Sequence, residues 1–402
     1  MMQDESIEFQ FPEVKDQTQH IIKVIGVGGG GGNAVENMYR QGVHNVSFAV
    51  CNTDSQALNA NEVPIKIQLG DGLGAGGDPE KGREAAEKTI DSVQRLLGDQ
   101  TQMVFITAAM GGGTGTGAAP IIAKACKEKG ILTIGVVTIP FRFELNKKIY
   151  KALAGVERMK KCVDALLVIN NERIRDIYSD YSTEQAFKKA DEILAVATRS
   201  IAEIITKKGI VNRDFCDVKA VMENGGAAIM AEGMASGEHR VEKAMMNALN
   251  SPLLNCNDIR TAKRLLYVIY QSESSPLAVT ELDYVTQFMN ELQDEVDVNW
   301  GLYSDDSLGE NIKVNIIATG FDEVEDAAAP SPEDDYAVLK EYYYGKGKSE
   351  TAPEVTPVAP AEPTVPEEEE EDSEEEEKPS GNKLGRSWKT FMTNLQIFLE
   401  ND

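Results

Sequence analysis

Apolar and polar residues alternate along the first half of the chain in the rhythm of an α/β protein. Short apolar runs predict buried strands, and the amphipathic stretches between them predict helices, notably over 79–97 and 120–129. The strands are expected at 21–25, 46–51, 103–107, 132–139 and 165–169. This order predicts a mostly parallel sheet covered by helices on both faces, which gives a Rossmann-like domain over residues 20–181.

A long helix is expected next, because helical periodicity continues beyond that domain. Ser182 and Gln185 have the spacing of a capping box, and Gly209 is a natural stop. We therefore predict a central helix over residues 182–209, which joins the first domain to a smaller α/β domain over residues 210–321. The helices of the second domain are expected at 238–250 and 282–292, and its strands at 264–270, 296–302 and 312–318.

Both ends of the chain differ in composition from the two domains. Residues 1–19 are polar, and residues 322–382 are acidic and rich in Glu, Pro, Ala and Lys, so both are expected to be disordered. A tyrosine-bearing patch at 334–344 indicates at most a transient helix. Apolar residues return on one helical face of the last segment, 383–402. Because this segment follows a linker and has no neighbouring core, we expect it to dock on another protein rather than on a membrane surface.

The charge and the cysteine usage of the chain limit its partners. The formal net charge is −26, which argues against nonspecific binding to nucleic acid, since that depends on excess Lys and Arg. The five cysteines contain no C-x-x-C pair, and the three histidines show no ligand spacing. Reduced thiols in a cytosolic protein are therefore favoured over a metal site. Neither a signal peptide nor a membrane-spanning segment is expected.

Glycine-rich segments follow two of the expected strands. Residues 26–33 read GVGGGGGN, with a helix predicted from Ala34, and residues 111–117 read GGGTGTG, before a helix with Pro120 in its first turn. Glycines leave backbone amides uncovered, and a helix start adds partial positive charge, so both segments suit phosphate oxygens. No G-x-x-x-x-G-K-[ST] sequence is present, which excludes an ordinary P-loop NTPase. Two such segments without a P-loop lysine predict a site that binds one polyphosphate from two sides.

These segments and several others resemble the nucleotide loops of the tubulin/FtsZ superfamily of GTPases and, within it, those of the bacterial FtsZ family. The resemblance covers residues 21–320. The matching motifs are KVIGVGGGGGN at 23–33, NTD at 52–54, GLGAGGDP at 72–79, GGGTGTG at 111–117, PFRFE at 140–144, NRDFCD at 212–217 and SPLL at 251–254. The resemblance implies a self-assembling GTPase of cytokinesis that forms head-to-tail filaments, with GTP as the substrate and Mg²⁺ as the expected metal.

The same resemblance implies where the protein works. It places the filaments in the cytoplasm, in a ring at the mid-cell division site. The ring would be held to the inner membrane only indirectly, through an adaptor such as the actin-like FtsA. Residues 383–402 are the segment expected to bind that partner.

The resemblance also assigns roles to individual residues. Those expected at the GTP phosphates are Gly29, Gly30, Gly31, Gly32, Asn33, Gly115, Thr116 and Gly117. Glu144 would hold the ribose and Phe187 would stack on the base, while Asn171 and Asp191 would read the guanine edge. A carboxylate can accept two parallel hydrogen bonds from guanine N1 and its exocyclic amine, a pattern that adenine lacks. Core packing of Phe187 and a turn at Asn171 are the structural alternatives.

Three positions depart from the usual pattern of the family. After Glu144 the family generally has Gly-x-x-Arg, whereas Leu145 and Lys148 occupy those positions here. Lys148 offers a point charge without the bidentate fork of an arginine, so its contact with the nucleotide is expected to differ. Asn170 stands where many members have proline.

The catalytic carboxylates are expected at the far end of the central helix. Asp214 and Asp217, together with Asn212, lie in the loop that resembles the polymer contact of the family. About 35 Å would separate Asp214 from Asp191 if the chain between them were helical, so Asp214 cannot reach its own nucleotide. It can reach that of a head-to-tail neighbour, where the carboxylates would orient or polarise the attacking water. An N-cap role for Asp217 is the alternative.

Two other functions agree with parts of the sequence. Gly26, Gly28 and Gly31 match the G-x-G-x-x-G fingerprint of nicotinamide oxidoreductases. Asp54 is loosely placed as the acidic residue of that fingerprint, but the glycines at 111–117 are then unexplained. A scaffold filament that binds GTP with little or no hydrolysis is the second alternative. It is favoured by the departures in the ribose loop and disfavoured by the intact catalytic loop.

Overall fold

The computed structural model describes residues 20–321, except 44, 99, 250–258, 291 and 293–294, together with residues 339–344. The first 19 residues, most of the acidic linker, the motif at 251–254 and the segment 383–402 lie outside the described residues. Predictions made for those segments stay predictions.

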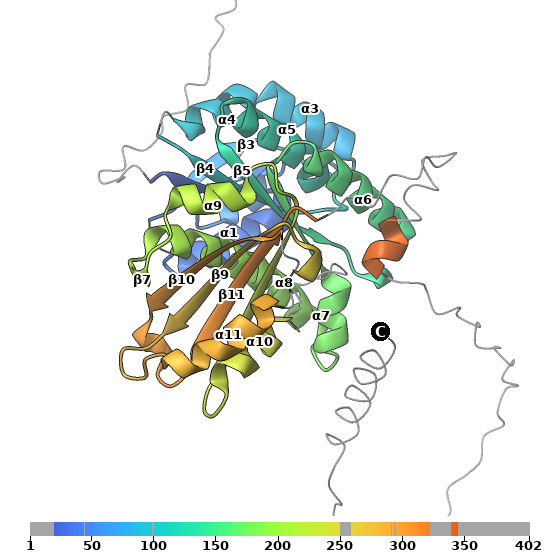
Figure 1. Ribbon diagram of the computed structural model, residues 1–402. Helices are drawn as coiled ribbons and strands as arrows, with labels where there is room; N and C mark the ends of the chain where they lie inside the picture. The colour runs from blue at the N-terminus through green and yellow to red at the C-terminus, as the bar shows by residue number, and fades with distance from the viewer. Residues whose placement is uncertain are drawn as a thin grey trace, which may run out of the picture. The chain divides into compact units, whose positions relative to one another are not determined.

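A single 11-stranded sheet passes through the described residues (Figure 1). Its strand order is β3-β2-β1-β4-β5-β6-β8-β11-β9-β10-β7. The first six strands in this order are parallel, and the order 3-2-1-4-5-6 is that of a doubly wound nucleotide-binding fold. Their bounds are β1 Ile22–Val27, β2 Ser47–Asn52, β3 Ile65–Gln68, β4 Met103–Ala109, β5 Leu132–Ile139 and β6 Ala165–Asn170. The predicted parallel sheet is confirmed, with β3 as an edge strand that the sequence pattern did not predict.

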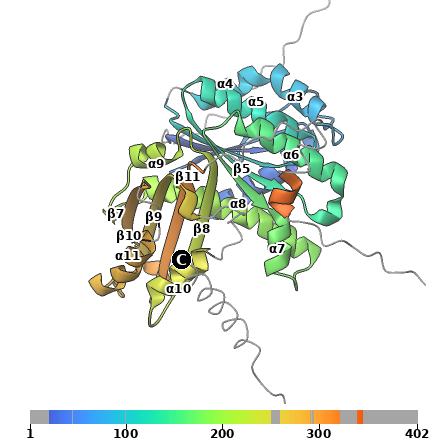
Figure 2. The same cartoon turned by 45° about the vertical axis from the view of Figure 1, so that its right-hand side comes forward.

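Helices cover both faces of this parallel sheet (Figure 2). One face carries α1 Gly28–Arg40 and α8 Thr183–Thr206, and the other carries α3 Pro79–Lys88, α4 Ile90–Leu97, α5 Thr114–Glu128 and α6 Asn146–Lys160. Two short helices, α2 Ser55–Ala60 and α7 Asn171–Ile177, follow the ends of β2 and β6. Side chains of β1 alternate between the two cores: Ile22 and Val24 join one, Ile25 and Val27 the other.

The glycine-rich segments are helix starts rather than loops. Both α1 and α5 begin six residues before the predicted starts, so Pro120 lies inside α5 instead of in its first turn. Packing explains the difference. A Cβ on Gly31 would lie 2.2 Å from the Thr107 carbonyl oxygen, so glycine lets α1 rest directly on β4. The predicted helix 79–97 is also wrong in one respect, because it divides at Thr89 into α3 and α4.

The central helix leads into the second lobe. The capping box of Ser182 and Gln185 is confirmed at the start of α8, which ends at Thr206, just before the predicted stop. The strands that follow are β7 Gly209–Val211, β8 Gly226–Ala235, β9 Arg264–Gln271, β10 Asp297–Ser304 and β11 Ile312–Thr319, and the helices are α9 Phe215–Met222, α10 Arg240–Leu249 and α11 Leu282–Asn290. Here the pairing is mixed, because β11 runs antiparallel to both β8 and β9. Since β8 pairs with β6, the two lobes share one sheet.

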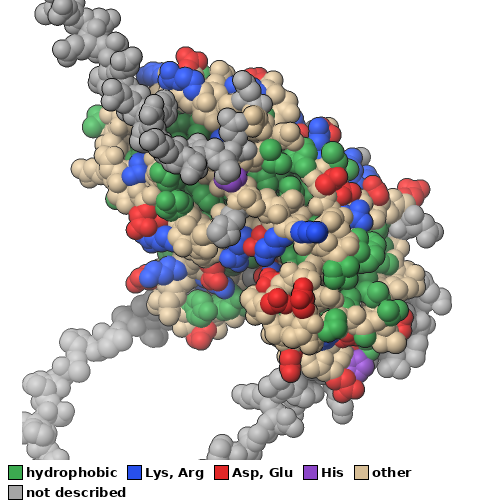
Figure 3. All heavy atoms as spheres, turned by 90° about the vertical axis from the view of Figure 1, so that its left-hand side faces the viewer, with side chains coloured by type: hydrophobic (Ala, Val, Ile, Leu, Met, Phe, Trp, Pro, Cys, Tyr) green, Lys and Arg blue, Asp and Glu red, His purple; other side chains and the backbone are tan. Residues whose placement is uncertain are grey.

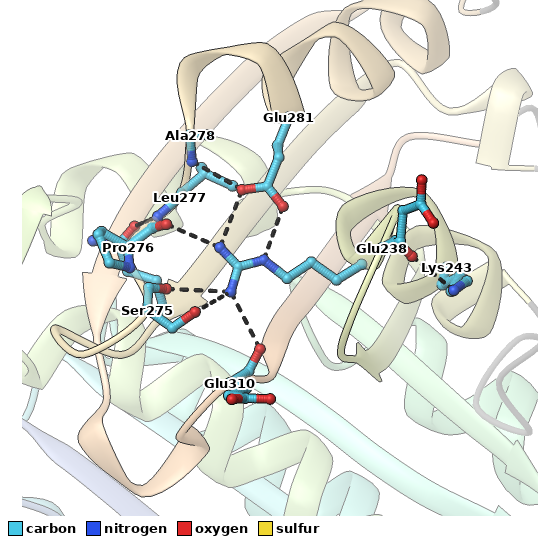
Figure 4. Close-up of polar contacts among 10 residues, drawn as sticks. Glu238, Lys243, Ser275, Pro276, Leu277, Ala278, Glu281 and Glu310 are labelled. Carbon is cyan, nitrogen blue, oxygen red and sulfur yellow. Dashed lines mark hydrogen bonds and ion pairs between the residues drawn. The ribbon is translucent and has the colours of Figure 1, made fainter.

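A buried arginine ties together one end of the second lobe (Figure 4). Arg240, the first residue of α10, is 7% exposed and donates to both carboxylate oxygens of Glu281, at 2.8 and 3.1 Å. It also donates to Ser275 Oγ (2.6 Å) and to the carbonyl oxygens of Ser275, Pro276 and Glu310. This side chain thereby joins α10 to the chain before α11 and to the loop before β11.

Residues 339–344, here called the docked segment, form a short helix against the first lobe (Figure 1 and Figure 2). They lie inside the segment expected to be a disordered linker, and that expectation is wrong for these six residues. Tyr344 is only 8% exposed and belongs to the hydrophobic cluster that contains α5 and α6. Leu339 and Tyr343 pack at the border of the cluster. These apolar positions are hard to recognise in the sequence, because acidic residues surround them.

Candidate nucleotide site

Two helix N-termini meet at the carboxyl edge of the parallel sheet. β1 pairs directly with β4; α1 begins immediately after β1, and α5 begins after the four residues 110–113 that follow β4. The two starts touch: a Cβ on Gly28, whose φ is +74°, would lie 3.0 Å from the Gly115 backbone nitrogen. Uncovered amides and the positive ends of two helix dipoles therefore converge on one place, which suits a polyphosphate.

The predicted phosphate residues divide into exposed and buried ones. Gly29 and Asn33 are exposed and Gly30 is half-buried, whereas Gly31, Gly32, Gly115, Thr116 and Gly117 are buried. A pocket beside Gly29 and Asn33 is lined by the end of β2 and by α2. Open space lies only over some of these glycines: a Cβ on Gly29 would meet nothing within 4 Å, but one on Gly115 would lie 2.6 Å from the Ala109 carbonyl oxygen.

The threonines of the second glycine segment have different surroundings. The Thr116 side chain is completely buried, and its hydroxyl accepts a hydrogen bond from the Gly111 amide at 2.8 Å. The Thr116 side chain thereby links the two ends of the glycine-rich segment and lies in the interior of the fold. Thr114 is only half-buried, and its hydroxyl lies 2.6 Å from that of Thr53. Sequence reasoning singled out Thr116 and gave no role to this pair, although both motifs that contain them were recognised.

The loop of residues 140–144, which is expected to hold the ribose, is called the ribose loop here. It lies against the glycine-rich segment 111–117. Glu144 ends the 3₁₀ turn Arg142–Glu144, and its Oε1 accepts from the Phe141 amide at 3.0 Å. The Lys148 ammonium forms an ion pair with Glu144 Oε2. A Cβ on Gly111 would lie 2.9 Å from Lys148 Cγ, so the stem of this lysine runs beside the glycines. Leu145 adopts φ +71° and ψ 157°, a backbone conformation that is essentially reserved for glycine.

The residues expected to read guanine include one buried acceptor that has no hydrogen-bond partner among the described residues, and one carboxyl with a raised pKa. Asn171 is 6% exposed, and its Oδ1 has no hydrogen-bond partner among the described residues. Asp191 is half-buried on α8, against which α7 packs, and burial raises the pKa of its carboxyl to about 7. Phe187, 41% exposed, meets Phe141 edge-on with 5.2 Å between the ring centroids. Unpartnered buried acceptors are rare, so a ligand with hydrogen-bond donors suits this position.

The carboxylates expected to act in catalysis lie at the opposite end of α8. This helix has 24 residues and is about 36 Å long at 1.5 Å per residue. Figure 1 shows α7 near one end of it and α9 near the other. Figure 3 looks onto the side that carries β7, where basic and acidic side chains intermingle. The geometry therefore separates the glycine-rich edge from the loop that contains Asn212, Asp214 and Asp217.

That loop is held by its own side chains. The Asn212 Oδ1 accepts from the Gly209 amide at 2.5 Å. Asp214, not Asp217, is the N-cap of α9, and its Oδ1 accepts from the amides of Cys216 (2.8 Å) and Asp217 (3.1 Å). The Asp217 carboxylate closes the capping box by accepting from the Asp214 amide, and it also pairs with Arg213. The alternative of an N-cap at Asp217 is therefore wrong, because the preceding aspartate fills that position.

No group of three or more His, Cys, Asp or Glu side chains is arranged to hold a metal ion within the described ranges. No helix in the part of the chain that the structure describes combines the length and the apolar character needed to cross a bilayer.

The first lobe is a doubly wound sheet with two converging glycine-rich helix starts and no P-loop lysine, and a long helix leads from it to a second lobe. This combination defines a GTPase with the tubulin-type fold. A family model described as the GTPase domain of the Tubulin/FtsZ family matches residues 21–179, and the C-terminal domain model of the FtsZ family matches residues 226–322. The chain belongs to the FtsZ family, and it is a GTPase that binds GTP.

Relatives and solved structures agree with this assignment. The chain is 50% identical over 326 residues to the cell division protein FtsZ of Porphyromonas gingivalis, covering 80% of this chain and 71% of the relative. It is 44% identical to FtsZ of Aquifex aeolicus, covering 75% and 83%. An FtsZ dimer from M. jannaschii superposes with a TM-score of 0.70 at 38% identity, covering 76% of this chain and 89% of that one. The resemblance drawn from the motifs is confirmed.

Proposed function

We propose that GTP bound at the glycine-rich edge of one subunit is hydrolysed against Asp214 and Asp217 of the next subunit in a head-to-tail filament. The chain is a cell-division GTPase that self-assembles. The observation that carries the junction mechanism is the length of α8, about 36 Å for its 24 residues, which lies between the two halves of the reaction centre. A contact between unlike ends of identical subunits does not close on itself and generates a filament.

The residues of the nucleotide end take the roles that their positions support. Backbone amides at the starts of α1 and α5, with Gly29 and Asn33 as the exposed residues, would hold the phosphates. Glu144 would bind the ribose hydroxyls, and its ion pair with Lys148 would keep that carboxylate beside the second glycine segment. Phe187 would stack on guanine, because its ring is exposed and braced by Phe141.

Asp191 and Asn171 would supply base specificity. The Asp191 carboxylate would accept from guanine N1 and the exocyclic amine, and Asn171 lies on the neighbouring helix with a free oxygen. Adenine presents no matching pair of donors. The buried Asn171 oxygen, which has no hydrogen-bond partner among the described residues, would gain one when guanine binds.

Mg²⁺ fits this site as a companion of the nucleotide. Since the described residues contain no cluster of three metal-binding side chains, the ion would bind chiefly through phosphate oxygens and water, which is common for Mg²⁺. When bound, it would neutralise charge on the transferring phosphoryl group. The amides of the helix starts would share that task, and Asp214 and Asp217 of the neighbour would orient the attacking water.

The wider assignment follows the family. We propose a nucleotide domain over 20–181, a central helix over 182–209 and an activating domain over 210–321. Residues 383–402 would bind an FtsA-like adaptor, and the filaments would lie in the cytoplasm at the mid-cell division site. The amphipathic sequence of the last segment, separated from the body by an acidic stretch, supports a docking role.

The test is the GTPase rate per subunit measured against protein concentration. A junction enzyme shows a steep onset at the concentration where filaments form, because a solitary subunit holds only half of the centre. Sedimentation in the same samples identifies that concentration. A rate per subunit that stays constant in a dilute preparation shown to be monomeric contradicts the proposal.

A further inference from the structure

The docked segment contacts the first lobe through specific hydrogen bonds as well as through apolar packing. The Tyr344 hydroxyl donates to the Pro140 carbonyl oxygen at 2.6 Å. The Asn170 side-chain amide donates to the Tyr343 carbonyl oxygen, also at 2.6 Å, and the Arg142 guanidinium donates to the Tyr344 carbonyl oxygen. More than 170 positions of sequence separate each donor from its acceptor, so these bonds are tertiary anchors.

Each anchor lies beside a residue assigned to the nucleotide. Pro140 and Arg142 belong to the loop that ends in Glu144, and the 3₁₀ turn in that loop has only three residues. Asn170 is the N-cap of α7, which has seven residues and begins with Asn171. Neither short element has enough internal hydrogen bonds to fix its own orientation.

The two loops are also joined to each other beneath the docked segment. Glu172 is 4% exposed, and its Oε2 accepts from the Arg142 amide at 3.0 Å. The Asn170 Oδ1 accepts from the Glu172 amide at 2.9 Å, while the amide group of the same side chain reaches Tyr343. Asn170 therefore uses one end to cap α7 and the other to hold the docked segment.

We propose that Tyr344 is a positioning residue for GTP binding, and that the docked segment holds the ribose loop and the start of α7 in the geometry the nucleotide needs. The proposal rests on the roles assigned above to Glu144 and Asn171. It predicts that a part of the chain beyond the second lobe sets nucleotide affinity without touching the nucleotide phosphates. The hydrogen bonds that carry it reach Pro140, Arg142 and Asn170, so the proposal concerns recognition of the ribose and the base.

The test is nucleotide affinity in dilute protein, below the concentration at which filaments form. Tyr344→Phe keeps the buried ring and removes only the bond to Pro140, and Asn170→Asp keeps the cap of α7 and removes the donor to Tyr343. Loss of one buried hydrogen bond corresponds to about a fivefold weaker affinity for GDP in each variant. Tyr39→Phe, which removes an exposed hydroxyl at the far end of α1, is the control and should match the native protein.

The steady-state kinetics of assembled protein separate positioning from a structural role. Positioning predicts a KM for GTP raised by the same factor, with an unchanged kcat at saturating GTP. An affinity within twofold of the native value in both variants, with only a lower unfolding temperature, overturns the proposal. The binding measurement needs no filament, so a failure of junction hydrolysis would appear separately, as a native rate per subunit that does not depend on concentration.

A double-variant experiment tests whether Tyr344 acts on nucleotide affinity through Glu144. Glu144→Gln removes the charge that the ribose loop is proposed to present. In that background, Tyr344→Phe should weaken GDP binding by clearly less than fivefold, since part of what it positions is gone. Full additivity of the two substitutions contradicts positioning through Glu144.

Discussion

The Asp214 and Asp217 carboxylates each accept a hydrogen bond from the other residue's backbone amide, at 3.1 and 2.9 Å respectively. This reciprocal cap fixes both side chains at the first turn of α9 and leaves them on the surface that faces away from the nucleotide edge. It also means that the two residues have a structural task besides the proposed catalytic one. Substitutions must separate these tasks.

Asp214→Asn does so, because asparagine caps a helix as well as aspartate but carries no charge. We expect normal stability, normal GDP binding and loss of most GTP turnover. Asp214→Ala should lose turnover too and should also cost about 1 kcal/mol of stability through the missing cap. Phosphate release and thermal unfolding are the measurements. Full turnover by Asp214→Asn would mean that the Asp214 carboxylate only caps helix α9.

Mixing provides a further check on the same residue. In a filament, an Asp214→Asn subunit inactivates the junction it shares with a native neighbour. Activity of mixtures should therefore fall below the native fraction if variant subunits also stall native filaments. A linear decline, in proportion to the native fraction, means that each variant subunit inactivates one junction and does not stall its neighbours.

Nucleotide affinity should depend on pH through Asp191. Burial raises the pKa of this carboxyl to about 7, whereas the proposed contact with guanine requires the ionised form. Binding then releases a proton, and the affinity for GDP should fall about tenfold from pH 8 to pH 6. Titration calorimetry in buffers of different ionisation enthalpy measures the proton. Asp191→Asn is the control: any pH dependence that it retains belongs to the phosphates.

The same shift affects the stability of the nucleotide-free protein. A carboxyl whose pKa is raised on folding binds its proton more tightly in the folded than in the unfolded state. Its destabilising effect is therefore complete above about pH 7 and is relieved as the pH falls toward the unfolded value of about 4. GDP should remove this dependence by satisfying the carboxylate. The unfolding temperatures with and without GDP, compared between native protein and Asp191→Asn, report it.

Leu145 offers a stabilising substitution. Its φ of +71° with ψ of 157° is strained for any residue with a Cβ, and its side chain is 72% exposed, so little packing is lost on removal. Leu145→Gly should raise stability by about 1 kcal/mol after the entropy of the glycine in the unfolded chain is included. Leu145→Ala keeps the strain and serves as the control. Equal unfolding temperatures for the Gly and Ala variants would show that the loop relaxes without cost.

Gly29 separates ligand contact from folding. A Cβ at this position meets nothing within 4 Å, so Gly29→Ala should fold with unchanged stability. If phosphates lie over the start of α1, the added methyl group should weaken GDP binding by at least about tenfold. Unchanged GDP affinity would mean that the phosphates do not lie over Gly29. Gly115→Ala is the contrasting variant, because its Cβ would meet the Ala109 carbonyl oxygen at 2.6 Å and should reduce stability as well.

Arg240 should matter for stability and not for nucleotide binding. Arg240→Ala leaves the Glu281 carboxylate and several carbonyl oxygens without their donor, at a cost of about 3 kcal/mol. The hydrogen bond from Arg240 lowers the pKa of Glu281, so its stabilising effect is present above the unfolded pKa and is lost as the pH falls through the lowered folded value. Denaturant unfolding at neutral and acid pH measures both effects. A loss of GDP affinity in folded Arg240→Ala would contradict this division.

The sequence pattern predicted the elements whose signal is local. Strand β5 has the predicted bounds, and Ser182 with Gln185 caps α8 as expected, because periodicity and capping chemistry act over a few residues. The starts of α1 and α5 were missed because glycine has a low helix propensity, and only the contact with β4 shows why it is needed there. Strand β8, GAAIMAEGMA, is rich in Gly and Ala and depends on pairing with β6 and β11.

The site shows the same division between local and tertiary information. Motifs located the expected nucleotide edge, but they did not show that Thr116 turns inward to the Gly111 amide or that the Asn171 Oδ1 lacks a partner among the described residues. The capping box of Asp214 and Asp217 is a local pattern, D-x-x-D, and assigning the cap to Asp214 was possible from sequence. The tyrosine-bearing patch indicated a transient helix, but its docking was not predictable, since its partners lie near positions 140 and 170.

The docked segment also shortens the reach of whatever binds the end of the chain. Covalent geometry allows at most about 3.5 Å per residue, so the 38 residues 345–382 span no more than about 130 Å from Tyr344 to the segment 383–402. Had the chain been free from residue 322 onward, the same limit would have been about 210 Å. The partner proposed for residues 383–402 would therefore stay within about 130 Å of Tyr344.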